Sequence, residues 1–341
     1  MTIGNEEQLE EVLSRPGEAD AAAMAAMQGD LLLLGVAGKM GPSLARRARR
    51  ACEAAGVSKR IVGVARFSNP GARRQLEEWG VETIAADLLT PGALRALPDF
   101  ENVVHMAARK FGSTGGSEYL TWAMNCYLPG RVAERFRHSR IVAFSSGNVY
   151  PFSPLRRGGP VESTPMVPVG EYGVTALGRE RIFEHFSRAN GTPVTILRLN
   201  YAIDLRYGVL LDVGQKVFDR RPVNLAMGHA NVIWQGDANS ICLRSFAVAQ
   251  SPPFVLNLTG PETVSIRWAA QRFGERFGIE PEFEGEEEET ALLNNAARCH
   301  RLFGYPSVSV EEMIEWVADW IGMGRATLNK PTHFEARDGK F

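Results

Sequence analysis

Three glycines stand at three-residue intervals directly after an apolar run, where they could receive a phosphate group. The stretch LLLLGVAGKMG places Gly35, Gly38 and Gly41 after residues 31–34. In a dinucleotide-binding turn the first glycine permits the bend, the second lets the backbone approach the pyrophosphate, and the third lets helix pack on strand. Free N–H groups at the start of the next helix favour an anion. The pattern predicts a pyrophosphate site; a tight buried turn without a ligand is the alternative.

Residues at the ends of the next apolar runs could hold the rest of such a cofactor. The second run ends at Arg66 and Ser68 and lacks the acidic residue that binds a ribose 2′-hydroxyl. An arginine there can bind a 2′-phosphate, which favours NADP over NAD; a solvated surface arginine is the alternative. Asp87 follows the third run, where its carboxylate could bind adenine. Small Ala107 and Ala108 would let a cofactor pass close to the backbone after the fourth.

A regular alternation of short apolar runs and helical stretches must position these residues. Helical patterns such as SLARRARRACEAAG (43–56) lie between the runs. The apolar runs are residues 31–36, 60–65, 82–86, 102–106, 140–145, 194–199 and 254–258. This alternation predicts an α/β fold, a Rossmann-type doubly wound parallel sheet with helices on both faces. Nearly continuous apolar runs are typical of a sheet that is buried on both sides.

Composition narrows the class of protein. The chain has 341 residues and a formal net charge of −1, so no general field draws it to nucleic acid or to a membrane. Its four cysteines form no CxxC pair and are expected to be reduced thiols of a cytoplasmic protein. The acidic N-terminus lacks the features of a signal peptide, and the longest apolar run is too short for a bilayer. No metal-ligand spacing occurs, so we predict no metal.

Several motifs in this order resemble the extended short-chain dehydrogenase/reductase family, the NAD(P)-dependent sugar epimerases and dehydratases. The motifs are GVAGKMG (35–41), AADL (85–88), VVHMAA (103–108), Asn125, AFSSGNVY (143–150), Tyr172 with Glu180, LRLNYA (197–202), NVIWQGDAN (231–239) and LNLTGPETVSI (256–266). The resemblance spans about residues 30–322. It implies a site between a cofactor domain and a smaller C-terminal substrate domain, and a homodimer formed through helices within 117–137 and 171–189.

The resemblance also divides the chain. We expect an N-terminal helical extension over 1–29, outside the main fold. The NAD(P)-binding domain is expected over 30–200, completed by about 231–260. The substrate domain is expected to combine 201–230 and 261–329, and 330–341 to form a polar tail. The implied cofactor-binding residues are Gly35, Gly38, Lys39, Met40, Gly41, Arg66, Ser68, Asp87, Leu88, Met106, Ala107, Ala108, Asn125, Ser145, Tyr172 and Asn200.

The family's catalytic roles carry over to two positions. Ser146 matches the residue that hydrogen-bonds the reacting oxygen, and Tyr172 matches the tyrosine that exchanges a proton with the substrate hydroxyl. Dehydratases of the family carry an Asp-Glu pair where this chain has Gly147 and Asn148, which disfavours water elimination. We interpret His105 as a core residue rather than a catalytic one.

One departure from the family matters most. The pattern is Tyr-x-x-x-Lys, but Ala176 holds the lysine position, and a free tyrosine with a pKa of about 10 is a poor base at neutral pH. Three explanations stay open. Another cation substitutes, either Arg179 or Lys110, while Lys39 is expected to face phosphate or solvent. Tyr172 only donates a hydrogen bond and another group is the base. Redox catalysis has been lost.

The substrate side is expected to follow the sixth apolar run. Arg206 could bind a carboxylate or phosphate, with a surface pair to Asp204 as the alternative. Trp234 could stack on a sugar, with core packing as the alternative. The predicted substrate residues are Ser146, Gly147, Asn148, Asn200, Tyr201, Arg206 and Trp234.

Together these features predict an NAD(P)-dependent oxidoreductase or epimerase that acts on a sugar or sugar derivative by hydride transfer at a carbinol carbon. Ser146, Tyr172 and Lys110 form the predicted catalytic set. The rival hypothesis is a catalytically impaired NAD(P)-binding regulatory or scaffold protein, supported by Ala176. An NADP-sensing partner protein is a third possibility.

Overall fold

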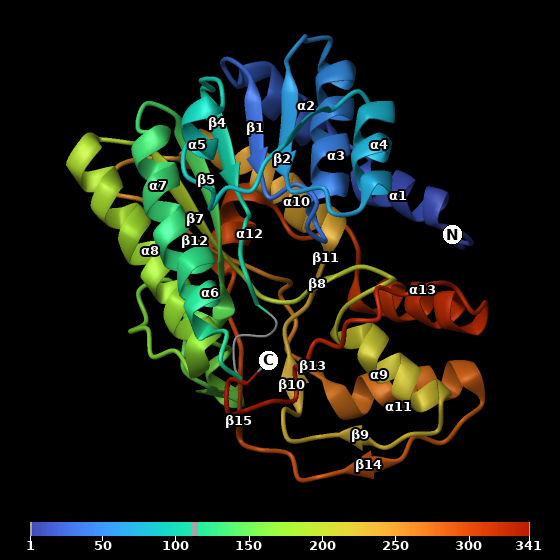
Figure 1. The fold of residues 1–341 in the computed structure, drawn as a ribbon. Coiled ribbons are helices and arrows are strands. Elements are labelled where there is room, and N and C mark those ends of the chain that lie inside the picture. The colour runs from blue at the N-terminus through green and yellow to red at the C-terminus, as the bar shows by residue number, and fades with distance from the viewer. Residues whose placement is uncertain (1, 111–114, 341) are drawn as a thin grey trace.

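A seven-stranded parallel sheet forms the centre of the computed structural model, which describes residues 2–110 and 115–340 (Figure 1). Its strands are β1 (Leu31–Leu34), β2 (Ile61–Ala65), β3 (Glu82–Ala85), β4 (Asn102–His105), β5 (Arg140–Ser146), β7 (Val194–Leu199) and β12 (Phe254–Leu258), in the order β12-β7-β5-β4-β1-β2-β3. Every predicted run forms one of these strands, and the predicted fold class is confirmed. The strand order reverses between β1 and β4, and such switch points are where doubly wound sheets bind ligands.

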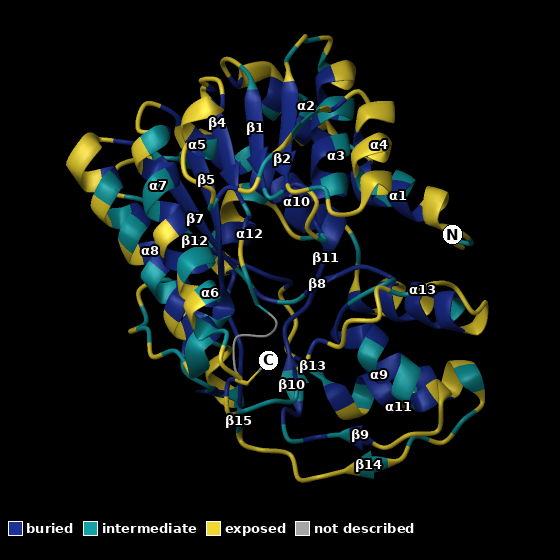
Figure 2. Ribbon diagram, viewed as in Figure 1, coloured by how far each residue is buried: buried dark blue, intermediate teal, exposed yellow. Residues whose placement is uncertain are grey.

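Helices cover both faces of the sheet because its strands are apolar on both sides. The side chains of Leu31 and Leu33 enter one buried cluster and those of Leu32 and Leu34 the other, as the two-residue period of a strand requires. The flanking elements are α3 (Gly41–Ala55), α4 (Pro70–Glu78), α5 (Ala93–Ala96), α6 (Glu118–Trp122), a π-helical segment (Ala123–Tyr127), α7 (Leu128–Arg135), α8 (Gly170–Asn190), α10 (Gln235–Arg244) and α12 (Ala297–Phe303). Figure 2 shows the inner strands β1, β2, β4 and β5 as almost continuously buried, whereas the edge strand β3 is exposed or half-buried.

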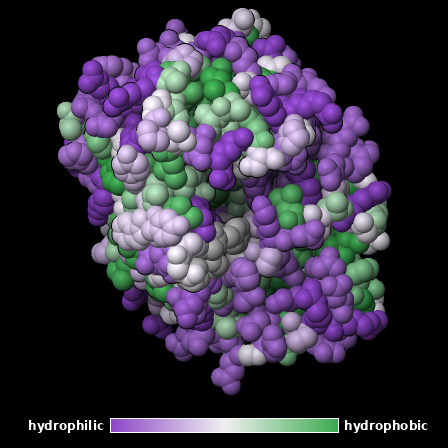
Figure 3. Space-filling model, in the orientation of Figure 1, coloured by the Kyte–Doolittle hydropathy of each residue, from purple (hydrophilic) through white to green (hydrophobic). Residues whose placement is uncertain are grey.

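A second hydrophobic core lies beyond the carboxyl ends of the strands. It is built mainly on α9 (Val209–Phe218), α11 (Ile266–Phe277) and α13 (Val310–Gly322). Short strands surround it: β6 (Ser153–Pro154), β8 (Ala202–Ile203), β9 (Val223–Asn224), β10 (His229–Ala230), β11 (Ile233–Trp234), β13 (Val264–Ser265), β14 (Phe283–Glu284) and β15 (Thr290–Ala291). Polar side chains cover most of the face seen in Figure 3. In the described part of the chain, no helix has the length and apolar character needed to cross a bilayer.

The two N-terminal helices, α1 (Glu6–Ser14) and α2 (Glu18–Ala26), do not lie outside the main fold as expected. Leu9 and Leu13 are fully buried in the second core. Asp20 forms a buried ion pair with Arg47 of α3, with 2.6 Å between its Oδ2 and the arginine Nη2. Burial of the leucines and this ion pair fix the helices to the body of the protein.

The C-terminal residues 326–340, which we call the strap, run back between the two cores (Figure 1). The backbone N–H of Leu328 donates to the carbonyl of Arg206 at 2.9 Å. The Thr332 N–H and hydroxyl both donate to the Asp212 carboxylate, at 2.7 and 2.6 Å. Phe334 is 2% exposed in the second core. The strap is therefore packed into the protein and not a loose tail.

Candidate active site

The three glycines of the first turn differ in what surrounds them. Gly35 has a φ of +93°, and a Cβ there would lie 2.8 Å from the Ala107 backbone. A Cβ at Gly41 would overlap the Val36 carbonyl. Gly38 is exposed, and a Cβ there would have only the Gly35 carbonyl oxygen, at 3.3 Å, within 4 Å among the described residues. The fold requires the outer two glycines, while the middle one leaves open backbone beside the N-terminus of α3, which fits a pyrophosphate.

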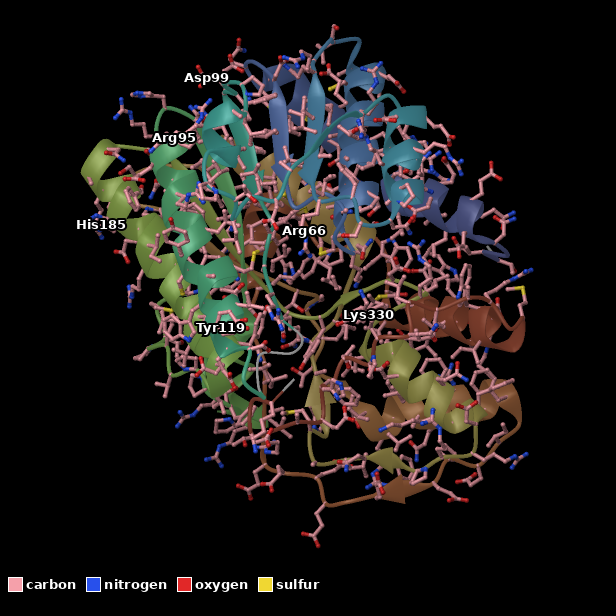
Figure 4. The ribbon with its side chains drawn as sticks, viewed as in Figure 1. Arg66, Arg95, Asp99, Tyr119, His185 and Lys330 are labelled. Atoms are coloured by element: carbon pink, nitrogen blue, oxygen red, sulfur yellow. The ribbon has the colours of Figure 1, made fainter. Side chains whose placement is uncertain are left out.

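Four other predicted cofactor residues follow strands at the same edge of the sheet. Arg66 and Ser68 are exposed just after β2, and Asp87 is exposed just after β3. Figure 4 shows Arg66 on the side of the sheet that faces the second core. Ala108 is exposed after β4. Because the carboxyl ends of parallel strands meet at one edge, these residues could contact one extended ligand.

The turn after β5 and the first turn of α8 bring Ser146 and Tyr172 into one site. The Ser146 hydroxyl donates to Asn148 Oδ1 at 2.9 Å and accepts from the Asn148 N–H at 3.2 Å. A Cβ at Gly173 would lie 2.7 Å from the Asn148 carbonyl oxygen, so only glycine allows this close approach. The start of α8, with Tyr172, is thus held against the segment that carries Ser146.

Asn125, in the π-helical segment, connects two parts of the site through hydrogen bonds of its side chain. Its side chain accepts from the Arg109 N–H and donates to the Arg109 carbonyl, each at 2.9 Å. It also donates to the Thr175 hydroxyl at 3.0 Å. Asn125 therefore ties the chain after β4 to α8, as expected of a structural asparagine, and its amide is already engaged by protein.

A buried ion pair supports the end of β5. Glu180 of α8 accepts from Arg198 Nε at 3.0 Å and Nη2 at 2.7 Å, and from the Ser145 hydroxyl at 2.5 Å. Arg198 also donates to the Tyr150 hydroxyl, which donates to Asn257. Glu180 and Arg198 both belong to motifs named from the sequence, but their pairing could not be predicted, because nothing local links an arginine on β7 to α8.

The three candidate cations have different surroundings. Arg179 is 2% exposed, and its Nη1 donates to the Phe144 carbonyl at 2.8 Å. Lys39 does not face phosphate or solvent as expected. Its Nζ donates to the Ala202 carbonyl at 2.6 Å and lies 4.4 Å from the centre of the Tyr207 ring. Burial lowers the pKa of Lys39 to about 7, although the Asp204 carboxylate opposes the shift.

Lys110 points toward the strap. Its Nζ lies 3.4 Å from the Thr332 carbonyl oxygen. Burial lowers the pKa of Lys110 to about 8, while the Asp212 carboxylate raises it. The structure therefore places this predicted catalytic residue against the second core, beside α9.

Two predicted substrate residues are engaged elsewhere. Trp234 is 2% exposed and packs edge-on against Trp316, so it belongs to the core and is not a platform for a sugar. Arg206 pairs with Asp204 and also with Glu10 of α1, each at 2.7 Å. The structure therefore agrees with the alternative reading of each residue: Trp234 packs in the core, and Arg206 pairs with Asp204.

The strap packs against one side of the predicted site. Ala336 and Gly339 of the strap, with Asn148 and Tyr201, line a cavity of only about 10 Å³. Such a space holds no more than a water molecule. Asn200 is buried beside it, and the backbones of Gly170 and Gly339 are in contact. Sequence patterns gave no signal for this packing, because the strap is irregular and polar.

Known proteins with this architecture include several sugar epimerases. UDP-glucuronic acid 4-epimerase from Bacillus cereus, in complex with UDP-glucuronic acid and NAD, is 19% identical, with a TM-score of 0.69 over 86% of this chain and 99% of its own. UDP-glucose 4-epimerase from Thermotoga maritima is 16% identical, with a TM-score of 0.68 over the same shares. The epimerase from Methanothermobacter thermautotrophicus is 17% identical, with a TM-score of 0.69 over 89% and 96%.

No curated protein sequence matches the chain. The sequence profile of the NAD dependent epimerase/dehydratase family matches residues 31–203, which is half of the chain and contains the glycine turn, Ser146 and Tyr172. These comparisons confirm the resemblance seen in the sequence. The chain belongs to the NAD dependent epimerase/dehydratase family.

Proposed function

We propose that this protein is an NAD(P)-dependent oxidoreductase or epimerase that acts on a sugar or sugar derivative at a carbinol carbon. One observation carries the proposal. The only glycine of the turn that is open to the outside, Gly38, lies on the same sheet edge as Ser146 and Tyr172. A dinucleotide held at that turn would extend along the carboxyl ends of the strands toward the serine and tyrosine.

In the proposed mechanism the chain orients the substrate and handles its proton. Bound nicotinamide supplies the hydride chemistry. Ser146 turns its hydroxyl from Asn148 to the oxygen on the reacting carbon and stabilises the charge that develops there. Tyr172 takes the proton of the substrate hydroxyl as the carbon becomes a carbonyl, and returns it in the reverse step. In an epimerase the hydrogen returns to the opposite face of the same carbon.

The cofactor is proposed to be NAD or NADP. Arg66 is exposed after β2 and is the one residue that favours NADP, through a 2′-phosphate. The epimerase from Bacillus cereus binds NAD, which supports NAD. Comparing the affinities of NAD and NADP for the protein and for Arg66→Ala decides between them.

The substrate class is proposed from the neighbours and limited by the strap. UDP-glucuronic acid is bound by the Bacillus cereus protein, so UDP-linked sugars are the first compounds to test. The cavity beside Asn148 and Tyr201 is too small for any sugar. We therefore propose that residues 326–340 move away from Asn148 and Tyr201 to admit a sugar.

A homodimer is proposed through the helices on the outer face of the sheet. Tyr119, which Figure 4 shows on this side of the molecule, is 68% exposed, Tyr127 is 59% exposed, and Val174 of the neighbouring α8 is 39% exposed. Large exposed apolar and aromatic side chains on adjacent helices favour a protein interface. Sedimentation at micromolar concentration tests this, and a monomer contradicts it.

The second candidate function is a non-catalytic NAD(P)-binding protein, and Ala176 favours it. The retained contact between Ser146, Asn148 and the start of α8 favours the enzyme, because binding alone does not need it.

The test combines purified protein with NAD or NADP and a panel of UDP-sugars, free sugars and sugar acids, followed by absorbance at 340 nm and NMR of the products. Reduced cofactor or an inverted carbon, absent in Tyr172→Phe, supports the enzyme. Tight cofactor binding with no turnover over the panel favours the second candidate.

A further inference from the structure

The guanidinium of Arg179 is a buried cation whose hydrogen bonds are incomplete. Nη1 donates to the Phe144 carbonyl, but Nε and Nη2 have no hydrogen-bond partner among the described residues. An arginine that is 2% exposed and so poorly paired costs the fold free energy, because its charge has left water without a matching carboxylate. Buried unpaired polar groups of this kind call for an explanation.

The groups that face Arg179 do not neutralise it. His105 of β4 is fully buried, and burial together with the Arg179 charge lowers its pKa to about 3, so the imidazole is neutral. Cys126 of the π-helical segment is a thiol whose pKa is raised by burial. Glu180, the nearby carboxylate, is already bound by Arg198 and Ser145. The positive charge of Arg179 is therefore not cancelled by an ion pair of its own.

The spacing along α8 places Arg179 on the same face of the helix as Tyr172. Arg179 follows Tyr172 by seven residues and Ala176 by three, so all three lie on one face of α8. A helical side chain leans toward the N-terminus and covers the turn before its own Cα. The Arg179 side chain thus extends over the turn of Ala176. Burial lowers the pKa of Arg179, and the negative charge of an ionised Tyr172 would oppose that shift.

We propose that Arg179 is the positioning residue that supplies the positive charge lost at Ala176, stabilising the phenolate of Tyr172 while the proton is on the substrate oxygen. The inference rests on the proposed function in that Tyr172 is the proton-exchanging group. The proton that leaves the Tyr172 hydroxyl goes to the sugar oxygen and returns in the reverse step, so no further reactant is needed. Burial raises the pKa of Tyr201 and of Tyr207, so neither carries a charge at neutral pH.

The effect of the Arg179 charge on the ionisation of Tyr172 can be estimated from the distance between the two residues along the helix. Seven residues of helix rise about 10 Å, and two unit charges about 10 Å apart at an effective dielectric of about 20 shift an ionisation midpoint by about one pH unit. Burial lowers the pKa of Arg179, but an arginine starts from a pKa so high that the guanidinium keeps its charge at working pH, and the effect is constant there.

The test measures the ionisation of Tyr172 directly and needs no substrate. Protein with ¹³Cζ-labelled tyrosine is titrated by NMR, and Tyr172→Phe assigns the signal. In Arg179→Gln and Arg179→Met the Tyr172 midpoint should rise by about one pH unit, whereas Arg179→Lys should keep most of the native value. The matched control is Arg181→Met, which removes a 60% exposed arginine from the same helix and should leave the midpoint unchanged.

A second readout separates this role from a structural one. Removing a poorly paired buried charge should leave the urea unfolding midpoint of Arg179→Met unchanged or raised, while turnover of any substrate found falls about tenfold below pH 8. An unchanged Tyr172 midpoint in both folded neutral variants would overturn the inference. The NMR titration measures the ionisation of Tyr172 even if the protein turns over no sugar. A protein without turnover would contradict the proposed function, whereas an unchanged Tyr172 midpoint would contradict this inference.

Discussion

The glycine turn allows the cofactor site to be tested separately from the fold. In Gly38→Ala the new Cβ meets only the Gly35 carbonyl oxygen, at 3.3 Å, and the backbone there is not in the left-handed region. We expect the free energy of unfolding to change by less than about 1 kcal/mol, since a compatible Gly→Ala change also reduces the entropy of the unfolded chain. The fold should therefore tolerate this methyl group.

The same methyl group should weaken cofactor binding, because it projects where the pyrophosphate must approach the backbone. Loss of one hydrogen bond to a charged group costs about 1.5–3 kcal/mol, which corresponds to roughly 10- to 100-fold in Kd. Titration calorimetry with NAD and NADP on the native protein and Gly38→Ala measures this. A folded Gly38→Ala that binds both dinucleotides with native affinity would refute the assignment of the turn.

Gly41→Ala is the matched control for that experiment. Its Cβ would overlap the Val36 carbonyl, which is backbone and cannot turn away. We expect Gly41→Ala to lower the urea midpoint of the protein whether or not a cofactor is present. The two variants thus distinguish a glycine kept for the ligand from a glycine kept for packing.

Three further predictions concern buried charge and the strap. Glu180→Gln should lower the free energy of unfolding by about 3–5 kcal/mol in urea, because it leaves Arg198 buried without its partner, and a loss under 1 kcal/mol would count against the ion pair. Because folding lowers the pKa of Lys39 from 10.5 to about 7, the unfolded chain binds more protons between these values, so this group makes stability rise as pH rises from about 7 to 10.5. Lys39→Met should flatten that rise between pH 7 and 9.5, and an unchanged pH dependence would contradict the burial of the ammonium. Thr332→Val removes a hydroxyl that donates to Asp212, so hydrogen exchange over residues 326–340 should quicken about tenfold, and unchanged exchange would mean that this bond does not hold the strap.

The sheet could be predicted from the sequence because its signals are local. A strand buried on both faces must be apolar at every position, and Leu31–Leu34 show this directly. The glycine turn and the segments around Ser146 and Tyr172 are contiguous motifs at strand ends, so the sheet topology brings them together. Such features need no knowledge of distant contacts.

The features that sequence reasoning missed depend on contacts between remote parts of the chain. Lys39 was expected to face phosphate or solvent, but its partner Ala202 is 163 positions away. Arg206 is held by Glu10, 196 positions away, which also explains why the N-terminal helices join the fold. Trp234 lies in a strand-like segment whose pattern is the same for a core residue and a sugar platform. Periodicity carries no information about such pairings.

The central claim is that hydrogen moves between one carbon of a sugar and bound nicotinamide, while Tyr172 exchanges the proton of the sugar hydroxyl. The most direct test incubates the protein and NAD(P) with a nucleotide sugar deuterated at the carbon that inverts, and follows product by NMR and mass spectrometry. We predict either an inverted product that retains the deuterium or an oxidised product with the deuterium on the reduced cofactor, and neither product from Tyr172→Phe. Inverted product carrying hydrogen from the solvent, or native turnover in Tyr172→Phe, would contradict it.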